Sequence, residues 1–315
     1  MMNRLKHPVG PALLLAVTLA GCRLEPLPAD AVAICFSVAT EVDVSTRTKA
    51  DLVGDSGIQS GTIKLYGSKG TEAVFAGTEL SYSGSAWTYS PLKYWERENA
   101  YAFRAVFPFD ASVSSGSSDE VVVAYDMASG YDLMVASSEV ASAPPTDNSV
   151  PLVFQHTTAA VRFLFKDGDQ DTYITSFELQ GLITSGTMTY NNTGDLPTWG
   201  STSSATYVWP GTSPWEVPED YDETGLEGWY FAIPQDDLTG ATLSFTYTVG
   251  NADGAQVLPV TIPLNTGSVT SWTRANAYTY KIQIQANAIE FDVDWEPWDS
   301  DGIIDYDLTG HQEQE

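Results

Sequence analysis

The chain is poor in basic residues and histidine, and both shortages narrow the range of functions. Of its 315 residues, 14 are lysine or arginine and 41 are aspartate or glutamate, a formal net charge of −27. Such a surface repels phosphate backbones, so we expect no nucleic acid partner. The three histidines form no His-x-His or His-Glu-x-x-His pattern, and the sequence has no Gly-x-Ser-x-Gly or phosphate-binding loop. These absences predict a protein that is not an enzyme and needs no cofactor.

Cysteine is also scarce, with only Cys22 and Cys35 present. A separate role for Cys22, given below, leaves Cys35 without a disulfide partner. Cys35 lies in the apolar run 31–38 with no histidine or lysine beside it to activate its thiol. We therefore expect Cys35 to be a small, buried hydrophobic residue.

No apolar run reaches the 18 residues or so of a transmembrane helix. The run Val9–Ala20 follows a basic region and ends at Leu19-Ala20-Gly21-Cys22. This order resembles the signal peptide and lipobox of bacterial lipoproteins, in which the cysteine is acylated and becomes the first residue. We expect a signal peptide at 1–21 and a lipidated tether at 22–30, the alternative being an ordinary secretory signal.

Helix-forming residues are few, whereas Ser, Thr, Gly, Tyr and Trp, which favour strands and turns, are abundant. Short alternating runs such as 60–66 recur between turn residues, without amphipathic helices between them. This pattern predicts an all-β protein built of sandwiches. The length suits two domains, and the Pro-containing segment 142–148 is the best linker. We expect an N-terminal sandwich at 31–148 and a C-terminal sandwich at 149–315.

Several segments resemble, in order, the motifs of the fimbrillin family, the type V pilus proteins of Gram-negative gut and oral bacteria. Together with the lipobox they cover most of residues 20–298. The segments are Tyr94-Trp95 with the strand 101–108, then 132–136, then 152–156 with 160–163, and finally 278–282 with 289–295.

The resemblance implies two tandem transthyretin-like antiparallel β-sandwich domains and a structural role in a cell-surface fimbria that mediates adhesion. It implies a precursor that is lipid-anchored at the outer membrane. In polymerising members an arginine-specific protease removes the N-terminal strand, and a strand from a neighbouring subunit fills the groove. The expected partners are other pilus subunits, the membrane, and a receptor on a host or bacterial surface.

Carried over to this chain, the cut falls between Arg47 and Thr48, in a polar and basic segment where proteolysis is easy. The alternative is a surface arginine between strands. The tail 299–315 offers a donor strand in which Ile304, Tyr306 and Leu308 alternate with acidic residues. The alternatives are the last strand of the chain's own sheet, or a frayed tail.

A second functional hypothesis is a monomeric surface lipoprotein of the same fold that binds glycans. Trp199, Trp209 and Trp215 lie in the Gly-, Ser- and Pro-rich stretch 194–228, and exposed aromatic rings can stack on sugars. The alternative is that these rings cover the end of a sandwich as a small core.

One acidic run matches part of a calcium-loop pattern. Asp167, Asp169, Asp171 and Glu178 fall at positions 1, 3, 5 and 12 of that pattern, but Thr172 replaces the required glycine. We favour a solvated hairpin turn over a weak calcium site, and we expect no metal. We also expect His156, which lies within a strand, to be a packed or capping residue.

Overall fold

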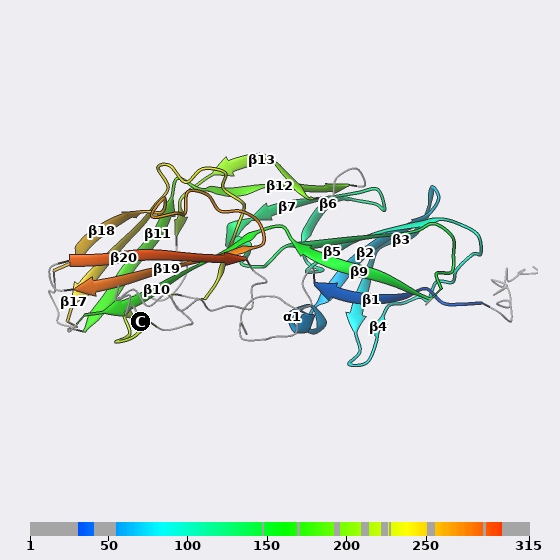
Figure 1. The fold of residues 1–315 in the computed structure, drawn as a ribbon, viewed down its shortest axis with the longest axis horizontal. Helices are drawn as coiled ribbons and strands as arrows, with labels where there is room; N and C mark the ends of the chain where they lie inside the picture. Colours follow the sequence, from blue (N-terminus) through cyan, green and yellow to red (C-terminus); the bar gives the residue numbers. More distant parts are fainter. Residues whose placement is uncertain are drawn as a thin grey trace, which may run out of the picture. The chain divides into compact units, whose positions relative to one another are not determined.

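The protein consists almost entirely of β-strands (Figure 1). The computed structural model describes residues 31–40, 55–146, 148–168, 171–191, 196–208, 214–221, 226, 228–250, 256–285 and 288–297. In this part of the chain the helices are α1 (Asp55–Ser60) and the 3-10 helix η1 (Met127–Ser129), and no helix is long and apolar enough to cross a membrane. The prediction of an all-β protein is thereby confirmed.

The largest sheet has seven strands in the order β1-β9-β8-β5-β2-β3-β4. Their bounds, in that order, are Cys35–Thr40, Ser149–His156, Met134–Val140, Tyr101–Phe107, Thr62–Lys69, Glu72–Tyr82 and Trp87–Thr88. One face carries a core because apolar residues recur at every second position, as Tyr101, Phe103, Ala105 and Phe107 do on β5. Ile58 of α1 is buried in the same core.

A four-stranded sheet packs against the other face of this large sheet. Its order is β13-β12-β7-β6, with bounds Thr198–Ser204, Ile183–Asn191, Glu120–Asp126 and Ser112–Gly116. Val106 and Val135 of the large sheet share a core with Val121, Val123 and Met188 of the smaller one. The two sheets therefore form a sandwich.

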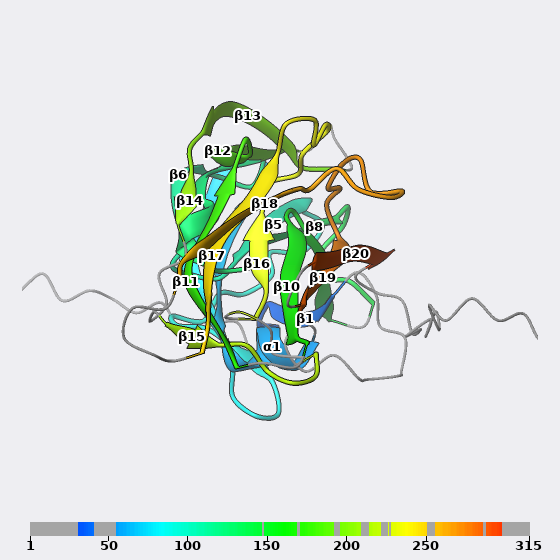
Figure 2. The ribbon, with the colours of Figure 1, turned by 90° about the vertical axis from the view of Figure 1, so that its left-hand side faces the viewer.

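The remaining strands form a second sandwich of two sheets. One sheet has the order β16-β10-β19-β20, with bounds Tyr230–Ala232, Ala159–Asp167, Asn276–Gln285 and Ala288–Pro297. The other has the order β14-β11-β17-β18, with bounds Tyr207–Val208, Thr172–Gln180, Thr242–Val249 and Leu258–Pro263, and β15 (Trp215–Glu216) also pairs with β11. Figure 2 shows β11 and β17 in one layer and β10 and β19 in the other.

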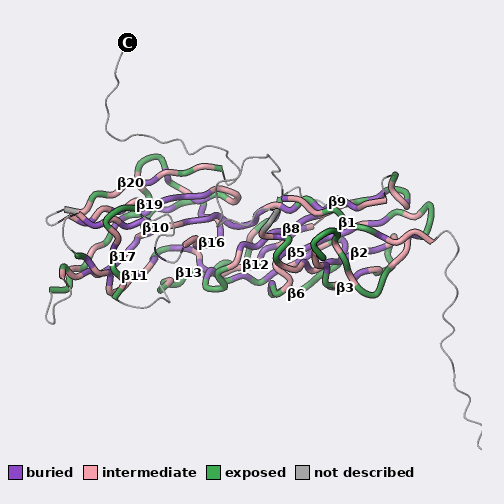
Figure 3. Tube along the Cα trace, turned by 90° about the horizontal axis from the view of Figure 1, so that it is seen from below, coloured by how far each residue is buried: buried purple, intermediate pink, exposed green. Residues whose placement is uncertain are grey.

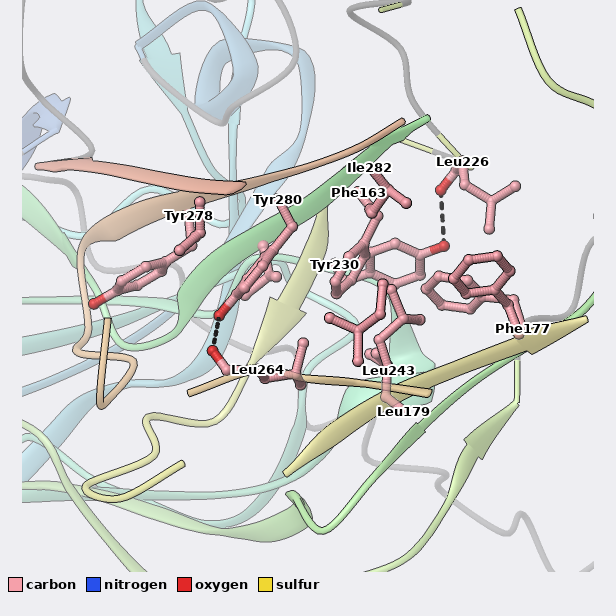
Figure 4. Close-up of a cluster of buried hydrophobic side chains, with 14 of the residues drawn as sticks. Phe163, Phe177, Leu179, Leu226, Tyr230, Leu243, Leu264, Tyr278, Tyr280 and Ile282 are labelled. Atoms are coloured by element: carbon pink, nitrogen blue, oxygen red, sulfur yellow. Dashed lines mark hydrogen bonds between the residues drawn. The ribbon is translucent and has the colours of Figure 1, made fainter. Parts of the chain in front are cut away.

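The core of the second sandwich is rich in aromatic rings whose polar atoms are paired (Figure 4). The hydroxyl of Tyr280 donates to the carbonyl of Leu264 at 3.0 Å, and that of Tyr230 donates to the carbonyl of Leu226 at 2.7 Å. Burial raises the pKa of Tyr280, so its hydroxyl stays protonated and able to donate. Figure 3 shows such buried positions along the central strands of both sandwiches.

The sheets do not separate at the expected boundary between residues 148 and 149. β9, which begins at Ser149, pairs with β1 and β8 of the first sandwich. The hairpin β12–β13 also belongs to the first sandwich. Met188 of β12 pairs with Val123 of β7, and its side chain is part of that core. The chain thus leaves the second sandwich after β11 and returns to the first. The periodicity of a single strand does not show to which sandwich that strand belongs.

Two strand pairs differ from the expected antiparallel arrangement. β1 runs parallel to β9, and β10 runs parallel to β19, whereas all other pairs of named strands in the described residues are antiparallel. Strands joined by a short hairpin must be antiparallel, but each of these pairs joins segments more than 100 residues apart. Their direction is therefore set by packing and not by a turn.

Candidate assembly site

β1 is the edge strand of the seven-stranded sheet, and it completes the core of that sheet. Phe36 pairs with Val150 and Val38 with Leu152 along the parallel ladder with β9. Ile34, just before β1, is 1% exposed, and Phe36 is 6% exposed. Side chains alternate across a strand, so Cys35 faces outward and is exposed, and the prediction that Cys35 is buried was wrong.

Phe36 occupies a pocket made of aromatic rings from other strands. Its ring lies 5.7 Å from Phe75, 5.5 Å from Phe103 and 5.8 Å from Tyr89, between ring centroids, all in edge-to-face geometry. Full burial of a phenylalanine or isoleucine side chain contributes about 1.5–3 kcal/mol, and edge-to-face pairs add to this. Two side chains, Ile34 and Phe36, therefore anchor the strand.

The segment 93–95 holds the start of this strand on the side opposite β9. The amide of Ile34 donates to the carbonyl of Lys93 at 2.9 Å, and the amide of Trp95 donates to the carbonyl of Val32 at 2.9 Å. The Tyr94-Trp95 motif thus has a physical role, since the backbone around it pairs with residues 32–34.

Tyr89 adds a side-chain contact that the sequence did not reveal. Its hydroxyl donates to the carbonyl of Ile34 at 2.8 Å while its ring packs on Phe36. Tyr89 lies in a short stretch without strand periodicity, so no pattern in the sequence marked it.

The described contacts of this strand are of a general kind. β1 and the residues just before it contact the rest of the first sandwich through backbone ladders, the hydroxyl of Tyr89 and apolar packing. These contacts depend on an extended backbone and on alternate apolar side chains, so any strand with the same pattern can make them.

His156 takes part in a buried polar cluster that also contains Asp132. His156 Nδ1 lies 2.7 Å from Asp132 Oδ2, and the hydroxyl of Thr158 donates to Asp132 Oδ1 at 3.0 Å. Arg274 donates to the carbonyl of His156 at 3.1 Å. The side chains of His156 and Asp132 are both buried, so the cluster ties β9 to the start of β10, in agreement with a packed histidine.

Two of the predicted tryptophans, Trp199 and Trp215, lie in the described part of the chain. Trp199 is half-buried on the core of the first sandwich, and its indole N–H donates to the carbonyl of Thr157 at 3.1 Å. Trp215 is half-buried on the core of the second sandwich, with its ring 6.0 Å from that of Phe165. These two rings therefore pack on different cores.

The calcium-loop geometry is not formed by the acidic residues that the structure describes. Asp171 precedes β11 and Glu178 lies near the end of that strand. Extended chain separates them by about 20 Å, so Glu178 is too far away to close a loop around an ion held by Asp171. Asp167 ends β10 and is buried. Among the described residues no group of three or more acidic, histidine or cysteine side chains could hold a metal.

Several predicted residues lie outside the described part of the chain. They are Cys22, Arg47, Thr48, Asp169, Trp209, Ile304, Tyr306 and Leu308.

The fold is that of a β-sandwich protein in which the first described strand completes a core formed by later strands. The chain belongs to the fimbrillin-like family, whose profile matches residues 45–298. This is a family of fimbrial and cell-adhesion proteins of the cell surface, normally without enzymatic activity. The recognition made from the sequence motifs is confirmed.

Solved structures share the fold. A candidate cell adhesion protein from Bacteroides uniformis aligns with a TM-score of 0.57 at 18% identity, over 86% of this chain and 99% of that one. A fimbrial protein from Bacteroides vulgatus aligns with a TM-score of 0.55 at 16% identity, over 84% of this chain and 99% of that one. The comparison with curated proteins gives no match. At these identities the solved structures support the fold alone.

The first prediction concerns the pocket of Phe36. We expect Phe36→Ala to lower the free energy of unfolding by about 3 kcal/mol, because it empties an aromatic pocket. Ser37→Ala on the outward face of the same strand should change it by less than about 0.5 kcal/mol. Urea denaturation of the two variants and the unaltered chain measures both values. A loss below 1 kcal/mol for Phe36→Ala would show that Phe36 is not an anchor.

The second prediction concerns the hydroxyl of Tyr89. Burial raises the pKa of Tyr89 to about 12 in the folded chain, against about 10 when unfolded. Because the folded pKa is the higher one, stabilisation by this group is fully present below pH 10 and is lost as the pH rises toward 12. We expect Tyr89→Phe to be less stable than the unaltered chain by about 1 kcal/mol at pH 8.

The pH dependence separates this hydrogen bond from a packing effect. The stability difference between the two chains should shrink between pH 10 and 12 in denaturation experiments. A difference that stays constant over that range would contradict the role given to the hydroxyl.

Proposed function

We propose that the chain is a structural subunit of a cell-surface fimbria, made as a lipoprotein precursor and assembled by exchange of the strand β1. The observation that carries this proposal is the position of β1. It is an edge strand, anchored by two side chains, in a core that later strands build.

The proposed cut lies in a suitable place along the chain. Arg47 falls between the end of β1 at Thr40 and the start of α1 at Asp55. Cleavage between Arg47 and Thr48 would separate β1 and everything before it, including the lipid proposed on Cys22, from all the later strands. The anchor would then hold the precursor at the outer membrane and would not hold the mature subunit.

Loss of β1 would leave a groove that must be filled again. The edge of β9 would lose its parallel partner, and the apolar rings of Phe75 and Phe103 would lose the ring of Phe36. An unpaired strand edge beside exposed apolar surface is a template for another strand. A strand from a second subunit would restore both the ladder and the core.

The tail of the chain matches the pattern of the strand that leaves. Ile34, Phe36 and Val38 alternate with Cys35 and Ser37, and Ile304, Tyr306 and Leu308 alternate with two aspartates. Both segments read aliphatic, aromatic, aliphatic at every second residue. In the proposed polymer Tyr306 of one subunit would take the pocket of Phe36 in the next, with the aspartates facing water.

The third prediction is a polymerisation experiment on the purified precursor. An arginine-specific protease should cut after Arg47, as the intact mass will show, and a gel of unboiled sample should then show a ladder of multimers. Arg47→Lys keeps the positive charge but removes the protease site, so this variant should remain uncut at that position and monomeric.

Two substitutions in the tail test the donor strand in the same assay. Tyr306→Asp should be cut normally but stay monomeric, because a charge cannot enter the aromatic pocket. Asp307→Asn, at an outward position of the same strand, should polymerise like the unaltered chain. A correctly cut chain that forms no ladder would contradict the role of a polymerising subunit.

A further inference from the structure

A polar hollow of about 500 Å³ lies on the sheet β13-β12-β7-β6, far along the chain from β1. Val121, Val123 and Tyr125 of β7 point into the core of the sandwich. The alternate residues Ala124 and Asp126 are exposed and line the hollow. Tyr125 and Tyr131, which pack on the core, line the hollow as well, so it extends from the exposed face of β7 to the rim of that core. Figure 1 labels the strands of this sheet.

The floor of the hollow consists of small side chains that lie side by side on three adjacent strands. Ala124 of β7 pairs with Ser112 of β6 on one side and with Thr187 of β12 on the other. Register shifts in the pairing of β12 with β13 lie on either side of Ser185. Such irregularities re-aim side chains at the edge of a flat sheet, and Ser185 lines the hollow.

Two aspartates and a tyrosine are also among the lining residues. Asp110 and Asp126 both line the hollow, and Asp126 is held in place because its Oδ1 accepts from the amide of Ala128 at 2.8 Å. Tyr131 is half-buried, with its ring 5.3 Å from that of Tyr125. Tyr125 also donates to the carbonyl of Tyr131 at 2.9 Å. Burial raises the pKa of Tyr131, so its hydroxyl stays neutral.

The chemistry of this lining selects among ligand classes. Two carboxylates repel anions. Ala124 of β7 and Thr187 of β12 lie on strands that are paired on both sides, so an extended peptide could add only at the outer edges of β6 and β13 and not over these two residues. Within the described residues no cluster of three metal-ligating side chains exists. A ligand rich in hydroxyl groups fits this lining, because a carboxylate accepts a hydrogen bond from a hydroxyl group. The hydroxyl groups of Ser and Thr can both donate and accept one.

We propose that this hollow binds one neutral sugar residue. The carboxylates of Asp110 and Asp126 would accept hydrogen bonds from ring hydroxyls, and the ring of Tyr131 would cover an apolar face of the sugar. The side chains of Ala124, Ser112 and Thr187 are small, so they would leave room for the sugar ring. No residue of the hollow belongs to β1 or its pocket, so sugar binding and strand exchange would be separate functions of one subunit.

The fourth prediction tests this site with saturation-transfer difference NMR on the full chain. The probes are glucose, galactose, mannose and N-acetylglucosamine at millimolar concentration. We expect saturation transfer to at least one of them. Ala124→Phe, which fills the floor, should abolish the signal. Val122→Phe is the matched control, because residue 122 lies on the same face of β7, pairs with Thr189 and lies outside the hollow, and it should keep the signal.

A third variant tests the carboxylate. Asp110→Asn should weaken the affinity about tenfold, since it removes a charge-assisted acceptor. Unfolding transitions and the multimer ladder serve as folding controls, and both should be the same for the two phenylalanine variants. Absence of transfer to all four sugars, or equal signals from Ala124→Phe and Val122→Phe, would overturn the sugar site without affecting the proposal of strand exchange.

Discussion

The insertion of Ile34 and Phe36 into the core of the seven-stranded sheet is the interaction on which the rest of the first sandwich depends. Phe36 lies in the first described strand and Ile34 just before it, whereas the pocket around Phe36 comes from β3, β5 and the segment that holds Tyr89. A core that needs a strand from elsewhere in the chain can also accept one from another chain, provided that the alternation is the same.

The parallel pairing of β1 with β9 fits the proposed exchange of this strand. A hairpin strand is tied to its partner by a short turn, but β1 and β9 lie more than 100 residues apart. The C-terminal end of β9 is held by other contacts, because Gln155 and His156 pair with β8 and His156 contacts the buried Asp132. This end of β9 therefore has partners other than β1.

The sequence predicted the strands well, but it did not predict how they join. Alternation marks which face of a strand is buried, as it does for Leu243, Phe245 and Tyr247 of β17, because that property is local. Pairing between distant strands is not local. The transfer of β9 and β12–β13 to the first sandwich and the parallel direction of β1 could not be predicted from single segments.

The same distinction applies to the candidate site. The motif Tyr94-Trp95 was visible, but its contact with residues 32–34 required the fold. Cys35 was expected to be buried because its neighbours are apolar, yet the pleat of the strand turns it outward. Tyr89 and the hollow beside Asp126 and Tyr131 are assembled from residues without a shared pattern, so only the folded chain brings them together.

The most direct test of strand exchange is hydrogen exchange of β9, measured by mass spectrometry in three states. These are the intact precursor, the cut chain held as a monomer by Tyr306→Asp, and the polymer of the cut chain. The account predicts protection of β9 in the precursor, fast exchange in the cut monomer, and protection again in the polymer. Unchanged protection after the cut, or a polymer in which β9 exchanges freely, would contradict it.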